Sequence, residues 1–286
     1  MTSLGSLAFV AAVTVCSWNG EWFPSGRAEH RAEPEVEAGT IREAGRMLRE
    51  GLAKVDPAGT NDLVFCFNEI RDPHAARLLC EAIGRTNLAV AVVTGYRRRD
   101  RFDMQQDVIA TTLPVAAADW SRWKTAKDET PPRGYARAQI VFSPAVTATV
   151  YSVHLKSNYG QTTEEAAALN RAKRDRAVRQ LVEQETDRKG RPKGGPVIVA
   201  GDFNADAWAR SFADDTIFDL FGRASFSNVL ELIPDKRRVT HPGRGRWGDT
   251  ALDYIMVRGL EVDGKPVVHP ADRVSDHRPV FVNIVP

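Results

Sequence analysis

The chain alternates short apolar segments with amphipathic ones, and this order restricts its fold more than any other feature. Nine segments have the length and the Val, Ile, Phe and Ala content of β-strands: 9–18, 62–68, 88–93, 107–111, 137–142, 147–154, 196–200, 250–257 and 279–284. Several of them follow one another with only a turn between them. The strict βαβ alternation of a doubly wound sheet is therefore absent, and we predict mixed sheets covered by helices.

Two helices are predicted by capping boxes. Thr40 with Glu43 precedes an apolar stripe, and Thr162 with Glu165 precedes a long helix that ends near Glu185. The outer face of this second helix is rich in Arg and Lys.

A third helix is predicted after Asp72 and Pro73, which supply an N-cap and a first-turn proline, and it ends at Gly84. The segments 112–135 and 210–250 show little periodicity, so we expect loops with short helical pieces there. Loops at strand ends commonly determine binding specificity.

The composition is that of a globular protein. With 43% hydrophobic and 27% charged residues and no linker or repeat, we expect one domain over 1–286 and take a monomer as the default. No segment approaches the ~20 apolar residues of a membrane span. Cys16, Cys66 and Cys80 lie in apolar stretches, which indicates buried thiols and favours a cytoplasmic location. Secretion stays open because the N-terminus is apolar, although it lacks the basic start of a signal peptide.

The motif Gly201-Asp202-Phe203-Asn204 follows an apolar strand. In extended backbone Asp202 and Asn204 point to the same side, so a carboxylate and an amide together could activate and position a water. A turn closed by an Asx-type hydrogen bond is the alternative explanation of this motif.

The motif Ser275-Asp276-His277-Arg278-Pro279-Val280 leads into the last strand. A buried carboxylate could hold His277 in one tautomer, and Asp253 is the candidate because it interrupts the apolar segment 250–257. A structural salt bridge is the alternative role for Asp253.

Polar groups also end the first two strands, at Asn19 and at Asn68-Glu69. If Asn19, Glu69, Asp202 and Asp276 converge, two carboxylates ~4 Å apart repel by about 4 kcal/mol at an effective dielectric constant of 20. A cation must then lie among them. Oxygen ligands favour Mg²⁺ or Mn²⁺ over zinc, and the sequence leaves open whether one or two ions bind.

Alternation along 150–158 places His154 and Lys156 on one face, and such a cationic pair suits a phosphate. A hydrogen-bonded structural histidine is the alternative. Asn158 and Arg133 complete the candidate substrate-binding residues.

Six motifs, in order, resemble the endonuclease/exonuclease/phosphatase superfamily, in particular its deoxyribonuclease-like branch: Trp18-Asn19, Asn68-Glu69, His154-Leu155-Lys156-Ser157, Gly201-Asp202-Phe203-Asn204, Leu252-Asp253-Tyr254-Ile255 and Ser275-Asp276-His277-Arg278-Pro279-Val280. The resemblance spans Val13 to Ile284. It implies a four-layer α/β sandwich of two packed mixed β-sheets flanked by helices, with a divalent-metal phosphodiesterase or phosphatase site at the upper edge of the sheets.

The resemblance also implies roles: a metal region with Glu69 as the principal ligand, a residue that activates or orients water, a phosphate or water positioner, and a histidine with its partner. Asn19, Glu69 and Asp276 correspond to the metal region. Asp202 corresponds to the residue that activates or orients water, and Asn204 to the positioner. His277 is the histidine, and Asp253 is its partner. His154 resembles the histidine of the deoxyribonuclease and sphingomyelinase branches, where apurinic-site endonucleases carry tyrosine. Inositol polyphosphate phosphatases are disfavoured because their Trp-Cys-Asp-Arg segment is replaced by Ala251-Leu252-Asp253-Tyr254.

The motifs are compatible with three functions. The first is a nuclease acting on DNA or RNA, because basic residues cluster at 97–101 and 171–179 although the net charge is only +2. The second is an enzyme acting on a lipid head group or a small phosphoester, for which Trp120, Trp123 and Trp208 are the only candidate membrane-facing side chains. The third, a non-catalytic binding module, is disfavoured because an empty carboxylate cluster costs stability.

Overall fold

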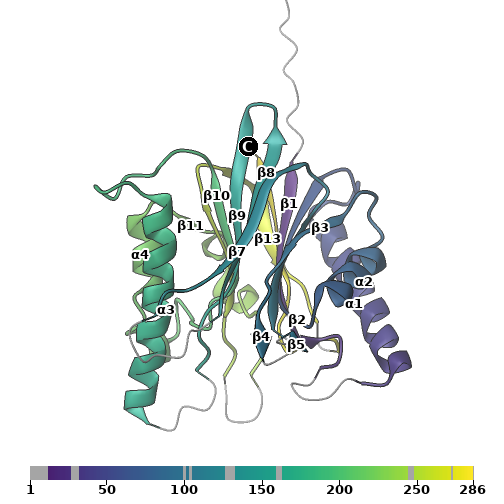
Figure 1. Cartoon of the computed structure of the whole chain (residues 1–286), viewed down its shortest axis with the longest axis horizontal. Coiled ribbons are helices and arrows are strands. Elements are labelled where there is room, and N and C mark those ends of the chain that lie inside the picture. The colour runs from purple at the N-terminus through teal and green to yellow at the C-terminus, as the bar shows by residue number, and fades with distance from the viewer. Residues whose placement is uncertain are drawn as a thin grey trace, which may run out of the picture.

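Two mixed sheets of six strands each pack face to face, and two pairs of helices cover their outer faces (Figure 1). The four-layer α/β sandwich expected from the sequence is confirmed. The computed structural model describes residues 12–26, 32–98, 101–102, 105–125, 133–158, 163–243, 248–271 and 273–285. Within these residues, no helix is both long enough and apolar enough to cross a membrane.

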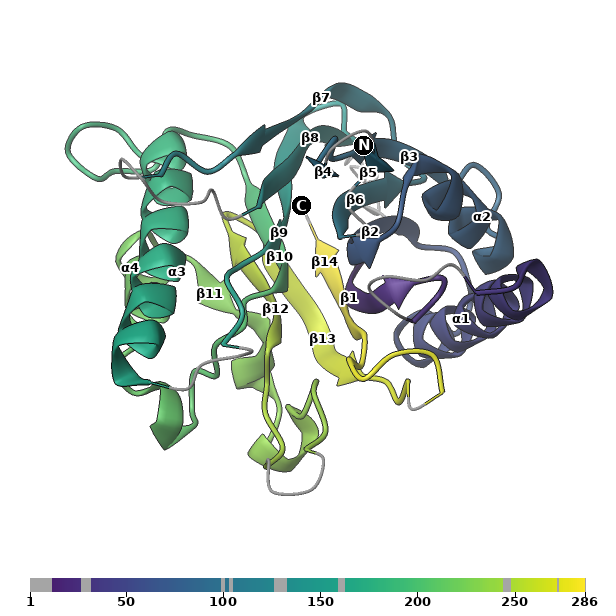
Figure 2. The same cartoon turned by 60° about the horizontal axis from the view of Figure 1, so that its bottom comes forward.

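The first sheet has the order β13-β14-β1-β2-β6-β3. Its strands are β1 (Val13–Phe23), β2 (Asp62–Ile70), β3 (Ala89–Val93), β6 (Gln106–Thr111), β13 (Glu261–Val268) and β14 (Val280–Val285). Helices α1 (Pro34–Val55) and α2 (Pro73–Ile83) lie along its outer face (Figure 2). A short hairpin of β4 (Arg97–Arg98) and β5 (Arg101–Phe102) extends from it.

The second sheet has the order β11-β12-β10-β9-β8-β7. Its strands are β7 (Val115–Arg122), β8 (Gly134–Ser143), β9 (Val146–His154), β10 (Val197–Asp202), β11 (Ser227–Asn228) and β12 (Asp253–Arg258). Helices α3 (Glu164–Glu185) and α4 (Ile217–Arg223) cover it, and 3₁₀ turns occur at Arg210–Phe212, Val229–Leu232 and Asp235–Arg237.

Strand β2 shows why the central strands read as continuous apolar runs. Val64 and Cys66 belong to the core that also contains Val150 of the second sheet, whereas Phe65 and Phe67 belong to the core beneath α1 and α2. Both faces of the strand are therefore buried, which removes the polar alternation of a half-exposed strand.

All nine segments that were predicted to be strands contain one, although the first residues of 9–18 lie outside the described residues. The prediction of loops over 112–135 was wrong for β7, which is an eight-residue strand at the sheet edge. Every residue of β7 is exposed, so no apolar alternation marks it. Strand β13, at the opposite edge of the molecule, was missed for a similar reason.

The predicted helix starts were right at Asp72, whose side chain accepts a hydrogen bond from the Ala75 amide at 2.8 Å. Gly84 ends that helix in the left-handed region, with φ 69°. The start at Thr40 was wrong because α1 begins at Pro34, and the Thr40 hydroxyl donates to a carbonyl within the helix.

The long third helix has its cap at Thr163, whose hydroxyl accepts from the Ala166 amide at 3.2 Å, and it ends at Glu185 as expected. Thr162, the predicted cap, lies outside the described residues.

Candidate active site

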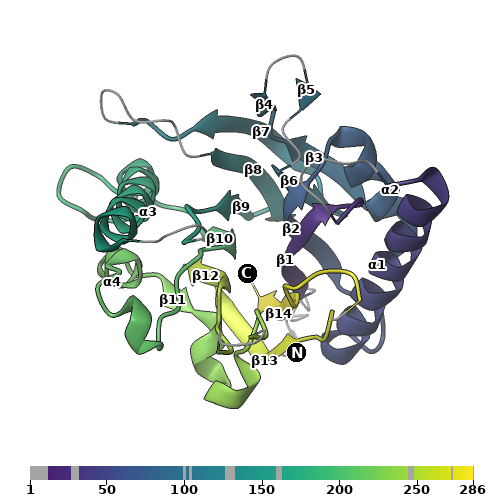
Figure 3. The same ribbon diagram turned by 90° about the horizontal axis from the view of Figure 1, so that it is seen from below.

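The candidate site lies where four strands end. β1 runs parallel to β2, and β9 runs parallel to β10, so each pair brings its carboxyl ends to one edge, seen from below in Figure 3. Asn19 pairs in register with Asn68. Asp202 lies in register between His154 of β9 and Asp253 of β12.

The register of the second sheet and the loop that precedes β14 together place titratable groups within contact distance. Asp253 Oδ2 is 2.7 Å from His277 Nδ1, so the predicted pair is present. Asp202 Oδ2 is 3.4 Å from His154 Nε2 and 3.9 Å from His277 Nε2. All four side chains are buried. The Asp202 carboxylate thus lies between the imidazoles of His154 and His277. The carboxylate of Asp253 orients His277.

The two histidines have opposite protonation tendencies. Burial lowers the pKa of His277, but the carboxylates of Asp253 and Asp202 outweigh it and raise this pKa to about 10. Burial lowers the pKa of His154 well below its usual value, and the charge of Arg133 lowers it further. Burial also raises the pKa of Asp202 to about 7. His277 is therefore a charged imidazolium and His154 a neutral imidazole, and both lie beside Asp202. Neighbouring groups whose pKa values are shifted apart in this way are typical of acid and base roles.

On the first sheet, an irregular backbone presents the polar groups. Between the pairs Asn19–Asn68 and Phe23–Ile70, β1 has three residues where β2 has only Glu69. Glu69 has φ 58°, an unfavourable conformation for a non-glycine residue. Such bulges commonly re-aim side chains beside functional sites.

The amide of Asn19 connects the two halves of the site. Its Nδ2 donates to Asp202 Oδ2 at 2.9 Å and to Glu69 Oε1 at 3.4 Å. The Trp22 amide donates to Glu69 Oε2 at 3.2 Å. Because both hydrogen bonds to Glu69 are long and its side chain is 12% exposed, its oxygens fit a hard divalent cation.

Asp276 lies on another side of the site. Its amide donates to Glu21 Oε2 at 2.8 Å, and its carboxylate lies near His241 and His277. Among the described residues, the groups of three carboxylate or imidazole donors that could hold an ion are His241, Asp276 and His277, and Asp202, Asp253 and His277. Neither group contains Glu69. The structure thus brings Asn19 to Glu69 but places Asp276 with the histidines.

The remaining predicted residues divide between the site and its surroundings. Asn204 has φ 52°, and its amide N–H donates to Asp202 Oδ1 at 2.8 Å, which is the Asx-type turn. Burial lowers the pKa of Lys156, and the charge of Arg133 adds to the effect. The Oδ1 of Asn158 accepts from Arg174 at 2.6 Å.

A buried network behind Asp202 was not anticipated. Asn68 Oδ1 accepts from the Asp202 amide at 2.9 Å, and Asn68 Nδ2 donates to Asp107 Oδ1 at 2.8 Å. Burial raises the pKa of Asp107 to about 7. Asp107 opens an apolar strand, so the argument that identified Asp253 could have identified it as well.

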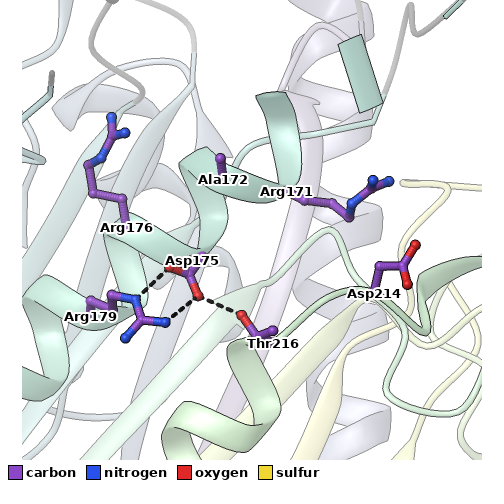
Figure 4. A pocket seen from close by; sticks show the side chains of 7 residues that line it. All are labelled: Arg171, Ala172, Asp175, Arg176, Arg179, Asp214 and Thr216. Carbon is purple, nitrogen blue, oxygen red and sulfur yellow. Dashed lines mark hydrogen bonds and ion pairs between the residues drawn. The ribbon is translucent and has the colours of Figure 1, made fainter. Parts of the chain in front are cut away.

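A separate pocket of about 360 Å³ lies between α3 and the segment that leads to α4 (Figure 4). Arg179 pairs there with Asp175 at 2.6 Å, and Thr216 donates to Asp175 at 2.5 Å. The pocket is lined by Arg171, Ala172, Asp175, Arg176, Arg179, Asp214 and Thr216. None of these residues belongs to the strand-end site, so the pocket is a basic surface feature and not the reaction centre.

Comparison with known proteins agrees with this geometry. The model of the Endonuclease/Exonuclease/phosphatase family matches residues 17–277. The chain belongs to this family. The matched range includes every residue that the strand-end site contributes, from Asn19 to His277.

Solved structures of endonuclease/exonuclease/phosphatase type share the fold at low identity. A family protein from Leptotrichia buccalis has 15% identity and a TM-score of 0.66, covering 96% of this chain and 99% of its own. TDP2 from D. rerio, complexed with a single-strand DNA product, has 17% identity and a TM-score of 0.62, covering 96% and 99%. Sphingomyelinase C from Streptomyces griseocarneus has 18% identity and a TM-score of 0.60, covering 95% and 99%.

Proposed function

We propose that this family member is a divalent-metal-dependent hydrolase that cleaves phosphodiester bonds in DNA or RNA. The observation that carries the proposal is the enclosure of Asp202 by His154, His277 and the amide of Asn19. A carboxylate held in this way can accept a proton from an attacking water while cationic and amide groups face the phosphate.

The oxygens of Glu69, Asn19 and Asp276 are the groups that would hold Mg²⁺ or Mn²⁺, as one or two ions. An ion held there would supply positive charge for a non-bridging phosphate oxygen. Asp202 accepts the proton of the water, and the raised pKa of His277 makes this residue a cationic stabiliser of the added charge. Asp253 holds the His277 ring through Nδ1, and Asn204 helps to fix the Asp202 carboxylate.

A polyanionic substrate is favoured by positive charge around His154. Arg133 and Lys156 both contribute charge at that imidazole, and Arg97 lies on the hairpin that follows β3. Three further arginines, Arg171, Arg176 and Arg179, line the separate pocket beside α3. Phosphate contacts of this kind dominate nucleic-acid affinity and make it sensitive to salt.

The second candidate substrate is a lipid head group or small phosphoester, since a sphingomyelinase shares the fold. Trp120 and Trp208 are 41% and 40% exposed, which fits a membrane-facing role, but each ring already has a neighbour. Trp120 packs on Tyr96, and Arg238 lies 4.2 Å above the Trp208 ring. These contacts favour structural roles and leave the nucleic acid as the first choice.

The proposal is tested with a substrate panel of single- and double-stranded DNA, RNA, sphingomyelin vesicles and a chromogenic phosphodiester, each with Mg²⁺ or Mn²⁺ and with chelator. We expect cleavage of nucleic acid that chelator abolishes, and its loss in folded Glu69→Ala and Asp202→Ala proteins. Turnover of only the lipid or the small ester would reject the nucleic-acid assignment. Calorimetry without any divalent-metal binding would instead support a binding module.

A further inference from the structure

His241 lies beside the site and has no role in the reaction proposed above. Its Nε2 is 3.7 Å from Asp276 Oδ2, and Asp276 Oδ1 is 3.9 Å from His277 Nε2. The rings of His241 and His277 have centroids 4.9 Å apart. One donor atom from each of the three side chains lies within 4.8 Å of the others. Two imidazoles and a carboxylate therefore converge.

The spacing is close to that of a metal-bound set. Bonds of about 2.0–2.2 Å at tetrahedral angles place neighbouring donor atoms about 3.4 Å apart. The two contacts of Asp276 exceed this value by about half an ångström or less. These contacts use Oδ2 of Asp276 for His241 and Oδ1 for His277, so side-chain rotation is needed to bring the carboxylate and both imidazoles onto one ion.

The backbone fixes the two segments that carry these donors. The Arg278 amide donates to the Thr240 carbonyl at 2.6 Å, which joins the segment of His241 to the loop of His277. His241 also exchanges two backbone hydrogen bonds with Thr250, at 2.9 and 3.0 Å. The donors are therefore held near one another before any ion binds, which lowers the ordering cost of binding.

The surroundings of His277 also suit a metal ligand. Its Nδ1 contacts Asp253 at 2.7 Å, which leaves Nε2 to face Asp276. Metal-ligating histidines usually carry such a carboxylate on the other nitrogen. The side chains of His241 and Asp276 are 28% and 26% exposed, so an ion can reach them from solvent.

We propose that His241, Asp276 and His277 form a binding site for a transition-metal cation of the Zn²⁺ type, which shares Asp276 with the proposed Mg²⁺ ligands but does not include Glu69. Imidazole nitrogens suit zinc and its first-row neighbours, whereas Mg²⁺ prefers oxygen. An ion at this site replaces the proton of His277 Nε2, the nitrogen that faces Asp202, and this proton is released to solvent. Filling the site therefore inhibits hydrolysis.

Binding is measured first, independently of any activity. Calorimetry of Zn²⁺ with the full chain in excess Mg²⁺ is compared among wild type, His241→Ala, His241→Phe and the control His74→Ala, which removes an exposed imidazole from α2. Circular dichroism verifies the fold of each variant. Removal of a residue that only hydrogen-bonds a metal ligand lowers metal affinity roughly 10- to 100-fold. We expect both His241 variants, which lose a ligand itself, to lose at least this much Zn²⁺ affinity, and the control to match wild type. Unchanged Zn²⁺ affinity in a folded His241 variant would overturn the proposal.

Visible absorption of Co²⁺ supplies a second measurement, because nitrogen coordination changes its spectrum. We expect a Co²⁺ spectrum with nitrogen ligands in wild type and in the His74→Ala protein, and its loss in His241→Phe. A spectrum that survives in His241→Phe contradicts the assignment of His241 as a ligand.

Inhibition is the functional consequence. His241→Phe should keep its Mg²⁺-supported turnover and require at least ~10-fold more Zn²⁺ for the same inhibition. Equal inhibition of wild type and His241→Phe would reject the inhibitory role. If the protein hydrolyses none of the tested esters, the proposed function fails while the metal-binding measurements still decide this inference.

Discussion

The two halves of the site are built in different ways. On the second sheet, regular pairing of β9, β10 and β12 places His154, Asp202 and Asp253 side by side. On the first sheet, Glu69 reaches the site because β1 bulges and the backbone of Glu69 is left-handed. One half relies on sheet register and the other on a departure from it.

The difference separates two kinds of chemistry. The register-built half is buried, and burial raises the pKa of Asp202 while the carboxylates of Asp253 and Asp202 raise the pKa of the adjacent His277. Such shifted groups suit proton transfer. The bulged half leaves the oxygens of Glu69 with long hydrogen bonds and partial exposure, which suits an ion that exchanges with solvent. We expect substitutions in the two halves to have distinguishable effects.

The largest expected effect compares Asp202→Asn with Glu69→Gln. Loss of a general base costs about 10²- to 10⁴-fold in turnover, so Asp202→Asn should be nearly inactive at every metal concentration. Glu69→Gln should lose comparable activity at low Mg²⁺ and recover part of it as Mg²⁺ is raised. Metal titrations of hydrolysis measure both. If high Mg²⁺ instead restored activity to Asp202→Asn and not to Glu69→Gln, the roles of metal ligand and general base would have to be exchanged.

The next effect tests how closely the register-built half is packed. A Cβ added at Gly201 would lie 1.9 Å from the Val153 carbonyl oxygen, and Gly201 has φ 144°. Gly201→Ala combines backbone strain with overpacking and should lower the free energy of unfolding by about 3 kcal/mol or more.

The matched control is Gly264→Ala, because Gly264 has φ 77° and open space around its Cβ position. It should cost only the ~1–2 kcal/mol of a left-handed conformation. Urea denaturation of both variants measures the difference. Equal costs would mean that β9 and β10 can separate and that the register is less restrictive than proposed.

A smaller effect concerns the network behind Asp202. The pKa of Asp107 rises to about 7 in the folded protein, so the folded state binds more protons than the unfolded state between about pH 4 and 7. This group therefore stabilises the fold most at acidic pH, and its contribution falls as pH rises, by at most about 1.4 kcal/mol per pH unit.

Asp107→Asn removes this titration and keeps an oxygen that can accept from Asn68. We expect the wild-type protein to lose stability from pH 4 to pH 7 relative to the variant. Other titrating groups are common to both proteins, so the difference between their denaturation profiles isolates Asp107. Parallel profiles would show that folding does not raise the pKa of this carboxyl group.

The two halves also differed in how far the sequence could predict them. The strand ends and the pairing of Asp253 with His277 followed from polar residues at fixed places in apolar runs. The position of Asp276 beside His241 depends on the meeting of two loops, which no local pattern encodes. The bulge at Glu69 has no periodicity of its own, and the contact of Asn158 with Arg174 depends on the packing of a helix that the sequence does not specify.

The smallest expected effect tests whether the electrostatics around His154 serve substrate binding. Arg133→Gln removes one positive charge near this imidazole and should weaken nucleic-acid binding about 10-fold or less, with the salt dependence of log affinity reduced by about 1. Arg188→Gln makes the same change on an exposed loop before β10, at the opposite end of the strands, and should leave both quantities unchanged. Binding isotherms at several salt concentrations measure the slopes. Equal slopes for the two variants would indicate that Arg133 contacts no phosphate and acts only on the protonation of His154.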